Sequence, residues 1–143
     1  MAADVRELVA RHLAFASSLS PPQNVFALEP SSLVDPAVTF FSCRRSGELL
    51  GIGALKQLSG CHGELKSMHT AQAARRMGVG QALVAHLIGV ARARGYQLLS
   101  LETGSMDGFA PARALYASAG FSVCGPFGDY QLSPYSTFMS LRL

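Results

Sequence analysis

The feature that most constrains the fold is a change of hydrophobic period around two glycines, Gly78 and Gly80. Before them, residues 64–70 alternate between two faces, as residues in a β-strand do. After them, apolar residues recur every three or four positions through residues 79–91, which predicts a helix with one buried face. The glycines permit a sharp turn and leave backbone N–H groups uncovered. Because free N–H groups and the helix dipole attract negative charge, this segment predicts an anion-binding loop.

Two well-known phosphate loops are excluded. The ATP-type loop requires Gly-x-x-x-x-Gly-Lys-Ser/Thr, which the chain lacks, and the dinucleotide fingerprint requires a glycine where Leu83 stands. The pattern that remains is Arg/Gln-x-x-Gly-x-Gly/Ala, carried by Arg75, Gly78 and Gly80. It resembles the pyrophosphate loop of the GNAT superfamily, the acetyl-CoA-dependent N-acetyltransferases.

A second segment resembles the same superfamily. Residues 114–121 read Ala-Leu-Tyr-x-x-x-Gly-Phe, similar to the GNAT signature Ala-x-Tyr/Leu-Tyr-x-x-x-Gly-Phe. The two matches, with a strand and a helix between them, extend the resemblance over residues 38–143. Further segments are similar to a bacterial GNAT subgroup of small-molecule acetyltransferases: residues 20–22, 27–28, 64–68, 100–106 and 120–130.

The patterns predict an α/β fold in which a parallel strand–helix–strand unit spans residues 64–102. The GNAT resemblance implies a mixed, largely antiparallel central sheet with helices on both faces. GNAT chains usually begin with a strand, whereas this chain begins with a helix, so the sheet could lack its first edge strand. The expected elements are a helix at 4–17, a helical turn near 31–34, a hairpin of strands 38–44 and 49–56, a central strand at 64–70, a helix at 77–94, a strand at 97–102, a helix at 111–120, and strands at 121–124 and 137–143.

Composition limits the partners and the setting. At 143 residues, the chain is expected to form one domain, residues 1–143. Its net charge of +3 is mild. The chain has no basic run interleaved with aromatic residues, the pattern that would indicate nucleic acid binding. The chain contains no run of 18 apolar residues, so no membrane span is predicted. The three widely spaced cysteines, Cys43, Cys61 and Cys124, favour a reducing compartment, which predicts a cytoplasmic protein. The oligomeric state is left open, and a homodimer is compatible with the sequence.

The resemblance implies that acetyl-CoA is the acyl donor. Backbone N–H groups of residues 77–81 would hold its pyrophosphate beside two arginines. The central strand would separate from its neighbour, so that its free backbone groups pair with the pantetheine arm like an added strand. The asparagine that many GNAT proteins carry before the motif tyrosine is Phe109 here, which puts one side-chain contact to coenzyme A in question. The implied cofactor-binding residues are Met68, Thr70, Arg75, Arg76, Met77, Gly78, Val79, Gly80 and Gln81.

Acetyl transfer also requires groups that move protons. The resemblance implies that Tyr116 is the general acid for the departing thiolate; the alternative is a helix tyrosine that packs against the sheet. Glu64 resembles the family's common glutamate base, or it is a solvated strand-end carboxylate or an ion-pair partner of Lys66. Glu102 is the rival base, or it anchors the loop that follows its strand. Either carboxylate could act through water.

The sequence therefore predicts an acetyl-CoA-dependent N-acetyltransferase that transfers an acetyl group directly to a small amine, with no metal. The four histidines show no metal-ligand spacing. The alternative is a non-catalytic acyl-CoA-binding sensor or interaction domain, which Phe109 favours. The acceptor pocket could include Asp129, Tyr130 and Tyr135, although a solvated loop would explain these residues equally well.

Overall fold

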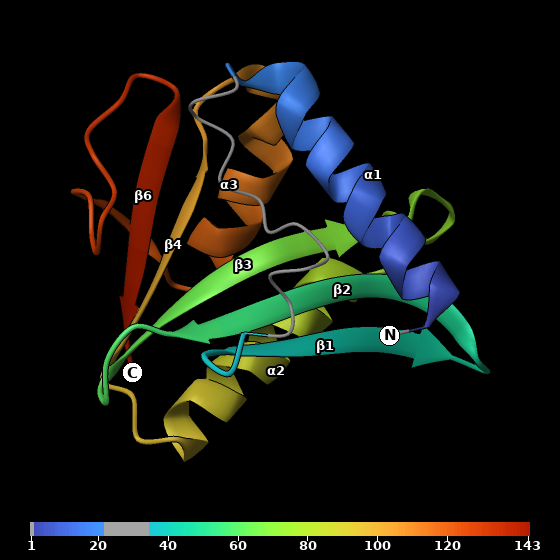
Figure 1. The fold of residues 1–143 in the computed structure, drawn as a ribbon, viewed down its shortest axis with the longest axis horizontal. Helices are drawn as coiled ribbons and strands as arrows, with labels where there is room; N and C mark the ends of the chain where they lie inside the picture. The colour runs from blue at the N-terminus through green and yellow to red at the C-terminus, as the bar shows by residue number, and fades with distance from the viewer. Residues whose placement is uncertain (1, 22–34) are drawn as a thin grey trace.

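The computed structural model describes residues 2–21 and 35–143 (Figure 1). The predicted helical turn near residues 31–34 and the subgroup match at 27–28 lie outside the described residues. The elements in chain order are α1 (Ala3–Leu19), β1 (Val38–Arg45), β2 (Glu48–Gln57), β3 (His62–Thr70), the short 3₁₀ helix η3 (Gln72–Ala74), α2 (Val79–Ala93), β4 (Leu98–Gly104), the 3₁₀ helix η4 (Asp107–Phe109), α3 (Ala110–Ser118), β5 (Ser122–Cys124) and β6 (Ser136–Arg142).

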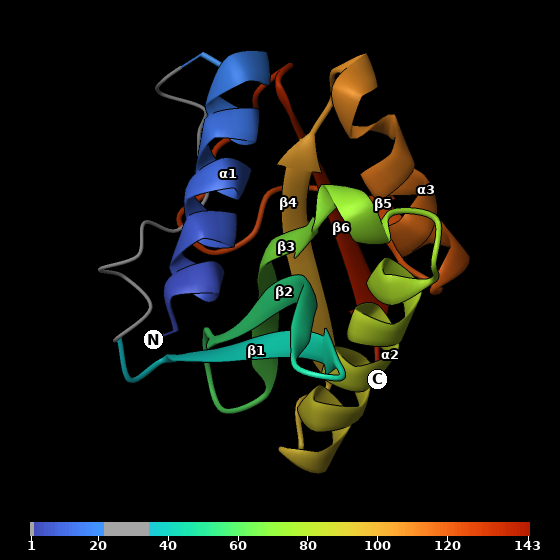
Figure 2. The same ribbon diagram turned by 90° about the vertical axis from the view of Figure 1, so that its right-hand side faces the viewer.

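The six described strands form one sheet in the order β1-β2-β3-β4-β6-β5. Only β3 and β4 pair in parallel, with α2 between them along the chain, and the other neighbours are antiparallel. Figure 2 shows α1 on one face of the sheet and α2 and α3 on the other. The predicted mixed, largely antiparallel α/β sheet is therefore confirmed. Among the described residues, no strand precedes α1.

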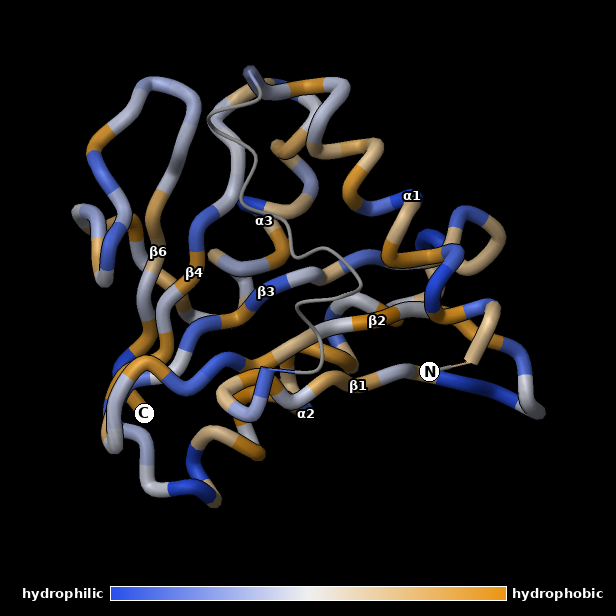
Figure 3. Tube along the Cα trace, viewed as in Figure 1, coloured by the Kyte–Doolittle hydropathy of each residue, from blue (hydrophilic) through white to orange (hydrophobic). Residues whose placement is uncertain are grey.

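Each face of the sheet carries its own apolar core. The larger core packs α2 and α3 onto the sheet, with Leu87 and Leu99 fully buried. On the opposite face, α1 buries Val9 against Ile52. Hydrophobic segments, orange in Figure 3, occur along β2 and α2, whereas the turn that joins β1 to β2 is blue. No helix in the described part of the chain is long and apolar enough to cross a lipid bilayer.

The separation of β3 from β4 shapes the site. β3 pairs with β4 only along residues 62–65, although it continues to Thr70, and Figure 1 shows the two strands diverging beyond that point. On its other side β3 remains paired with β2, but the register shifts opposite Ser67, whose φ of 57° is left-handed. A bulge of this kind bends a strand. The predicted separation near Met68 and Thr70 is present.

Two glycines in β2 allow neighbouring elements to lie close to the strand. A Cβ atom at Gly51 would lie 2.8 Å from Val79 Cγ1, at the first residue of α2. A Cβ atom at Gly53 would lie 2.6 Å from the sulfur of Met68. Glycine at these positions therefore allows α2 and β3 to pack directly against the β2 backbone.

We predict opposite stability changes for two glycine substitutions. Gly51→Ala should lower the free energy of unfolding by about 1–3 kcal/mol, because the new methyl group overpacks the contact with α2. Gly89→Ala, on the exposed side of α2 with no atom within 4 Å of the added Cβ, should raise it by about 0.5–1 kcal/mol through helix propensity. Denaturant unfolding measures both values, and an unchanged stability of Gly51→Ala would contradict the close packing.

Candidate active site

The glycine loop opens α2 as predicted, although the helix starts at Val79 and not near Met77. Gly78 is the N-cap with a left-handed φ of 78°, and Arg76 is also left-handed at 66°. The first N–H that bonds back within the helix is that of Ala82, which donates to the Gly78 carbonyl at 3.0 Å. The N–H groups before it have no intrahelical acceptor and are available to an anion.

A cleft of about 680 Å³ extends from this loop to the separated end of β3. Its remaining walls come from α1 through Phe15 and from α3 through Leu115 and Tyr116. Of the predicted cofactor-binding residues, only Met77 is not part of the lining, and its side chain is 46% exposed. The predicted residues that line the cleft are Met68, Thr70, Arg75, Arg76, Gly78, Val79, Gly80 and Gln81.

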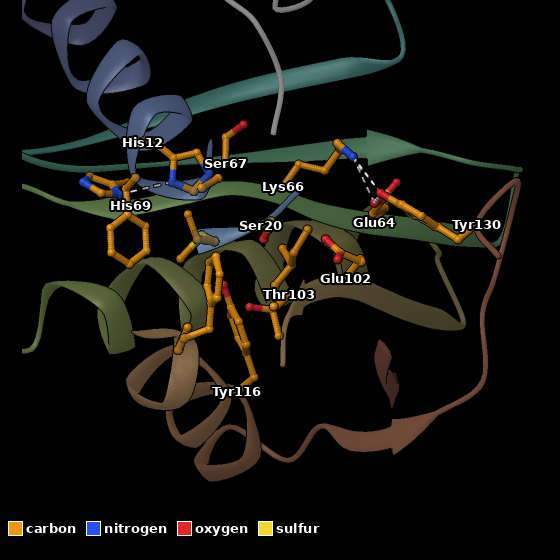
Figure 4. A pocket seen from close by; sticks show the side chains of 17 residues that line it. His12, Ser20, Glu64, Lys66, Ser67, His69, Glu102, Thr103, Tyr116 and Tyr130 are labelled. Carbon is orange, nitrogen blue, oxygen red and sulfur yellow. Dashed lines mark hydrogen bonds and ion pairs between the residues drawn. The ribbon is translucent and has the colours of Figure 1, made fainter. Parts of the chain in front are cut away.

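A second, smaller pocket of about 110 Å³ lies between α1, β3 and β4 (Figure 4). Both candidate carboxylates, Glu64 and Glu102, line it, and neither lines the larger cleft. The two cavities are adjacent where β3 and β4 separate, because six residues line both. The residues that line both are Phe15, Met68, His69, Phe109, Ala112 and Tyr116.

Tyr116 packs in the core and also lines both cavities. Its side chain is 7% exposed and its ring contacts Phe121 edge-on, with centroids 6.0 Å apart, so it packs in the core. It also lines both cavities, and its hydroxyl has no hydrogen-bond partner among the described residues. Burial, aided by the negative charge of Glu102, raises the pKa of the Tyr116 phenol above its usual value. The hydroxyl therefore stays protonated at neutral pH.

Glu64 is buried and paired. Its side chain is not the solvated strand-end carboxylate that the sequence allowed, because the residue is only 3% exposed. Its Oε2 atom accepts hydrogen bonds from the Lys66 ammonium at 3.2 Å and from the Tyr130 hydroxyl at 2.5 Å (Figure 4). The predicted ion pair with Lys66 is present, and it forms along one strand. Glu64 thus already accepts two hydrogen bonds from neighbouring side chains.

Glu102 lies in a different environment on the neighbouring strand. Burial raises the pKa of its carboxyl group to about 7; the Ser136 hydroxyl and the Lys66 ammonium oppose this rise, and the charge of Glu64 adds to it. The loop after β4 is held by Arg113, which donates to the Gly104 carbonyl at 2.7 Å and to the Met106 carbonyl at 3.0 Å. Arg113 therefore anchors this loop, which is the role that the sequence offered as an alternative for Glu102.

The fold brings a pair of histidines together in the smaller pocket, which no sequence pattern predicted. The Nδ1 atoms of His12, on α1, and His69, on β3, lie 3.1 Å apart, although 57 positions separate them in the chain. Burial lowers the pKa of His12 to about 4 and also lowers the pKa of His69. Both imidazoles are therefore neutral near pH 7 and share one hydrogen bond.

The remaining candidate residues differ in whether they line the smaller pocket. Of the three loop residues proposed for the acceptor pocket, Tyr130 lines it, whereas Asp129 and Tyr135 do not. Phe109 packs against the backbone of Gly104 and lies edge-on to Phe15, with centroids 5.4 Å apart. Within residues 2–21 and 35–143, no group of three or more His, Cys, Asp or Glu side chains could hold a metal ion.

Comparison with known proteins agrees with this geometry. The model of the acetyltransferase (GNAT) family matches residues 5–121. The uncharacterized N-acetyltransferase YsnE of Bacillus subtilis is 48% identical over 139 residues, covering 97% of this chain and 92% of the relative. A solved structure from Klebsiella pneumoniae, classed as an acyl-CoA N-acyltransferase, is 31% identical with a TM-score of 0.80, covering 99% of this chain and 90% of that one.

A more distant structure shares the fold alone. A GNAT family acetyltransferase from Elizabethkingia anophelis with acetyl-CoA bound is 17% identical to this chain. The match has a TM-score of 0.64 and covers 84% of this chain and 94% of the Elizabethkingia anophelis chain. The family model and the relative at 48% identity each match most of the chain. This protein belongs to the acetyltransferase (GNAT) family.

Proposed function

We propose that this protein transfers an acetyl group from acetyl-CoA directly to a small amine. The observation that supports this reaction is the meeting of a large cleft and a small pocket at Met68 and Tyr116. Direct transfer requires both substrates in one place at the same time, with the amine within attacking distance of the thioester. A long donor in the cleft and a small acceptor in the pocket would satisfy that requirement.

Acetyl-CoA fits the larger cleft by its chemistry. Its pyrophosphate would accept hydrogen bonds from the N–H groups of residues 79–81, with Arg75 and Arg76 adding positive charge. The pantetheine arm would pair with the edge of β3 that β4 leaves unpaired beyond Leu65. This path brings the thioester to Met68, where a free backbone N–H could polarise its carbonyl. The relative with acetyl-CoA bound supports this donor.

The proposed transfer balances its protons with two side chains. The amine nitrogen attacks the thioester carbon, a C–N bond forms and the C–S bond breaks. Glu102 takes the proton from the amine, directly or through water, and Tyr116 gives its proton to the departing thiolate. We favour Glu102 over Glu64 as the base, because Glu64 already accepts hydrogen bonds from Lys66 and Tyr130. Glu64 would instead fix the charge and position of Lys66.

The state of the three cysteines bears on the cellular compartment. Cys43, Cys61 and Cys124 are all unpaired thiols, which suits a reducing compartment, and we propose the cytoplasm.

The rival function, an acyl-CoA-binding domain without turnover, would bind acetyl-CoA but release no thiol when amines are added. Measuring thiol release from acetyl-CoA with a panel of amines separates the two functions.

We predict that Gln81→Glu weakens coenzyme A binding by roughly twofold to tenfold while slightly stabilising the protein. The new charge at the exposed start of α2 favours the helix dipole but repels the pyrophosphate. Gln97→Glu, which adds the same charge at an exposed site before β4, is the matched control. Calorimetry at low salt measures the affinities. Equal coenzyme A affinity of the two variants would place the pyrophosphate elsewhere.

We predict that Tyr116→Phe lowers kcat by roughly 10²-fold or more and leaves coenzyme A affinity and the melting temperature nearly unchanged. The hydroxyl donates no internal hydrogen bond, so its removal costs little stability. Tyr96→Phe is the control, because Tyr96 is equally buried but its hydroxyl donates to Gln57 at 3.4 Å, away from both cavities. Full turnover by Tyr116→Phe would leave solvent as the proton source.

We predict two pH effects of Glu102. As a base with a pKa of about 7, it should make kcat/KM rise with pH through that value, and Glu102→Gln should lack this rise. Its pKa in the folded state is raised from 4.5, so the folded protein holds the proton more tightly than the unfolded chain does. The contribution of Glu102 to the free energy of unfolding should therefore fall as pH rises from about 4.5 to about 7, whereas His12, with its pKa lowered from 6.5 to about 4, contributes a rise over much of the same range. The difference between the parent protein and Glu102→Gln isolates the contribution of Glu102.

Unfolding curves across that pH window test the second effect without any acceptor. Glu102→Gln should remove this fall in stability relative to the parent protein. If the parent and the variant show the same dependence on pH, Glu102 does not have a raised pKa, and its assignment as the base fails.

A further inference from the structure

We propose that the smaller pocket contains a polar subsite, formed by Ser67, His12 and His69, that binds the carboxylate of a small α-amino acid acceptor. This inference rests on the proposed acetyl transfer and names its acceptor class. The amine of such an acceptor would face Glu102 and Tyr116, and its carboxylate would face the subsite. Figure 4 shows the three subsite residues in the part of the pocket next to α1.

Ser67 supplies a buried hydroxyl that no other described residue uses. The residue is 6% exposed, lines the pocket, and its Oγ atom has no hydrogen-bond partner among residues 2–21 and 35–143. A buried polar group without a partner is costly, so its presence calls for an occupant that completes its hydrogen bonding. The backbone of Ser67 is also left-handed, with a φ of 57° in the middle of a strand. Such strain is typical of positions that the surrounding structure holds for function.

The histidine pair adds a second donor. One proton lies between the two Nδ1 atoms, which are 3.1 Å apart, so one ring donates and the other accepts. With both rings neutral, the accepting ring carries its single N–H proton on Nε2, and the donating ring has a lone pair on its Nε2. The pair therefore offers one N–H in addition to the Ser67 hydroxyl. Two neutral donors suit a group that accepts hydrogen bonds.

The charges along the pocket give the acceptor a direction. The carboxylates of Glu64 and Glu102 act on the Tyr130 end, where Lys66 partly balances them. At the other end, the positive charges of Arg75 and Arg11 act on His69 and contribute to lowering its pKa after burial. A zwitterionic acceptor would thus be oriented with its nitrogen toward the carboxylates and its carboxylate toward the histidines.

Spacing and size select an α-amino acid. The last pair between β3 and β4 is Leu65 with Leu101, so Ser67 lies only two positions, and Glu102 only one position, beyond it on neighbouring strands. The two polar groups of the acceptor must therefore be close to each other, as the amine and carboxylate of an α-amino acid are. The pocket volume of about 110 Å³ suits a small molecule, and Phe15 and Phe109 offer an apolar wall for a short side chain.

The test compares three acceptors that differ at one group: L-alanine, L-alaninamide and ethylamine. Thiol release gives kcat/KM for each, and calorimetry with coenzyme A present gives each affinity. We expect the parent protein to prefer alanine over ethylamine by roughly tenfold or more, because hydrogen bonds to the charged carboxylate of alanine stabilise its complex by about that factor. Because the amines differ in their own pKa, the quantity compared is this preference ratio in the parent and in each variant.

Ser67→Ala and Ser67→Gly both remove the hydroxyl, and the glycine variant also accommodates the left-handed backbone. In both, the alanine-to-ethylamine ratio should fall by roughly fivefold or more. Ser42→Ala, at an exposed position on β1, is the matched control and should keep the ratio of the parent. Using two variants keeps the test valid if one of them folds poorly.

The outcomes separate the subsite from the reaction. Thiol release without a preference for alanine, or a preference that survives in both Ser67 variants, overturns the subsite and leaves acetyl transfer standing. Alanine binding that depends on Ser67 but gives no thiol release supports the subsite and overturns the transfer. Failure of alanine to bind the coenzyme A complex overturns the inference.

Discussion

The structure depends above all on one constraint, the early end of pairing between the parallel strands β3 and β4. Their ladder stops at Leu65, while β3 keeps its contact with β2 through a bulge at Ser67. The resulting gap lets residues from both faces of the sheet meet, Phe15 from α1 and Tyr116 from α3. It also leaves one edge of β3 with free backbone groups. A fully paired sheet would close the gap and separate the two cavities.

The gap also explains how two carboxylates on neighbouring strands acquire different properties. Glu64 lies where β3 and β4 still pair, and its charge is matched by Lys66 and by the hydroxyl of Tyr130. Glu102 lies one position beyond the last pair and forms no ion pair with a described residue, and burial raises its pKa to about 7. A buried carboxyl group with a raised pKa is suited to the role of a general base at neutral pH.

Much of this could be predicted from the sequence because the signals are local. The change of period around Gly78 identified β3, the loop and α2, and the motif around Tyr116 identified α3. Features that need distant partners could not be predicted. The His12–His69 pair and the Tyr130–Glu64 hydrogen bond join residues 57 and 66 positions apart. The left-handed backbone of Ser67 could not be predicted either, because a positive φ is uncommon for serine, whereas glycine adopts it readily.

The central claim is that the gap between β3 and β4 receives the thioester end of acetyl-CoA. A crystal structure of the complex with acetyl-CoA tests it most directly. The account predicts the pyrophosphate on the N–H groups of residues 79–81, the pantetheine arm along the free edge of β3, and the thioester sulfur within roughly 3–4 Å of the Tyr116 hydroxyl. A cofactor bound outside the cleft, or one whose sulfur lies far from Tyr116 with the gap closed, would contradict it.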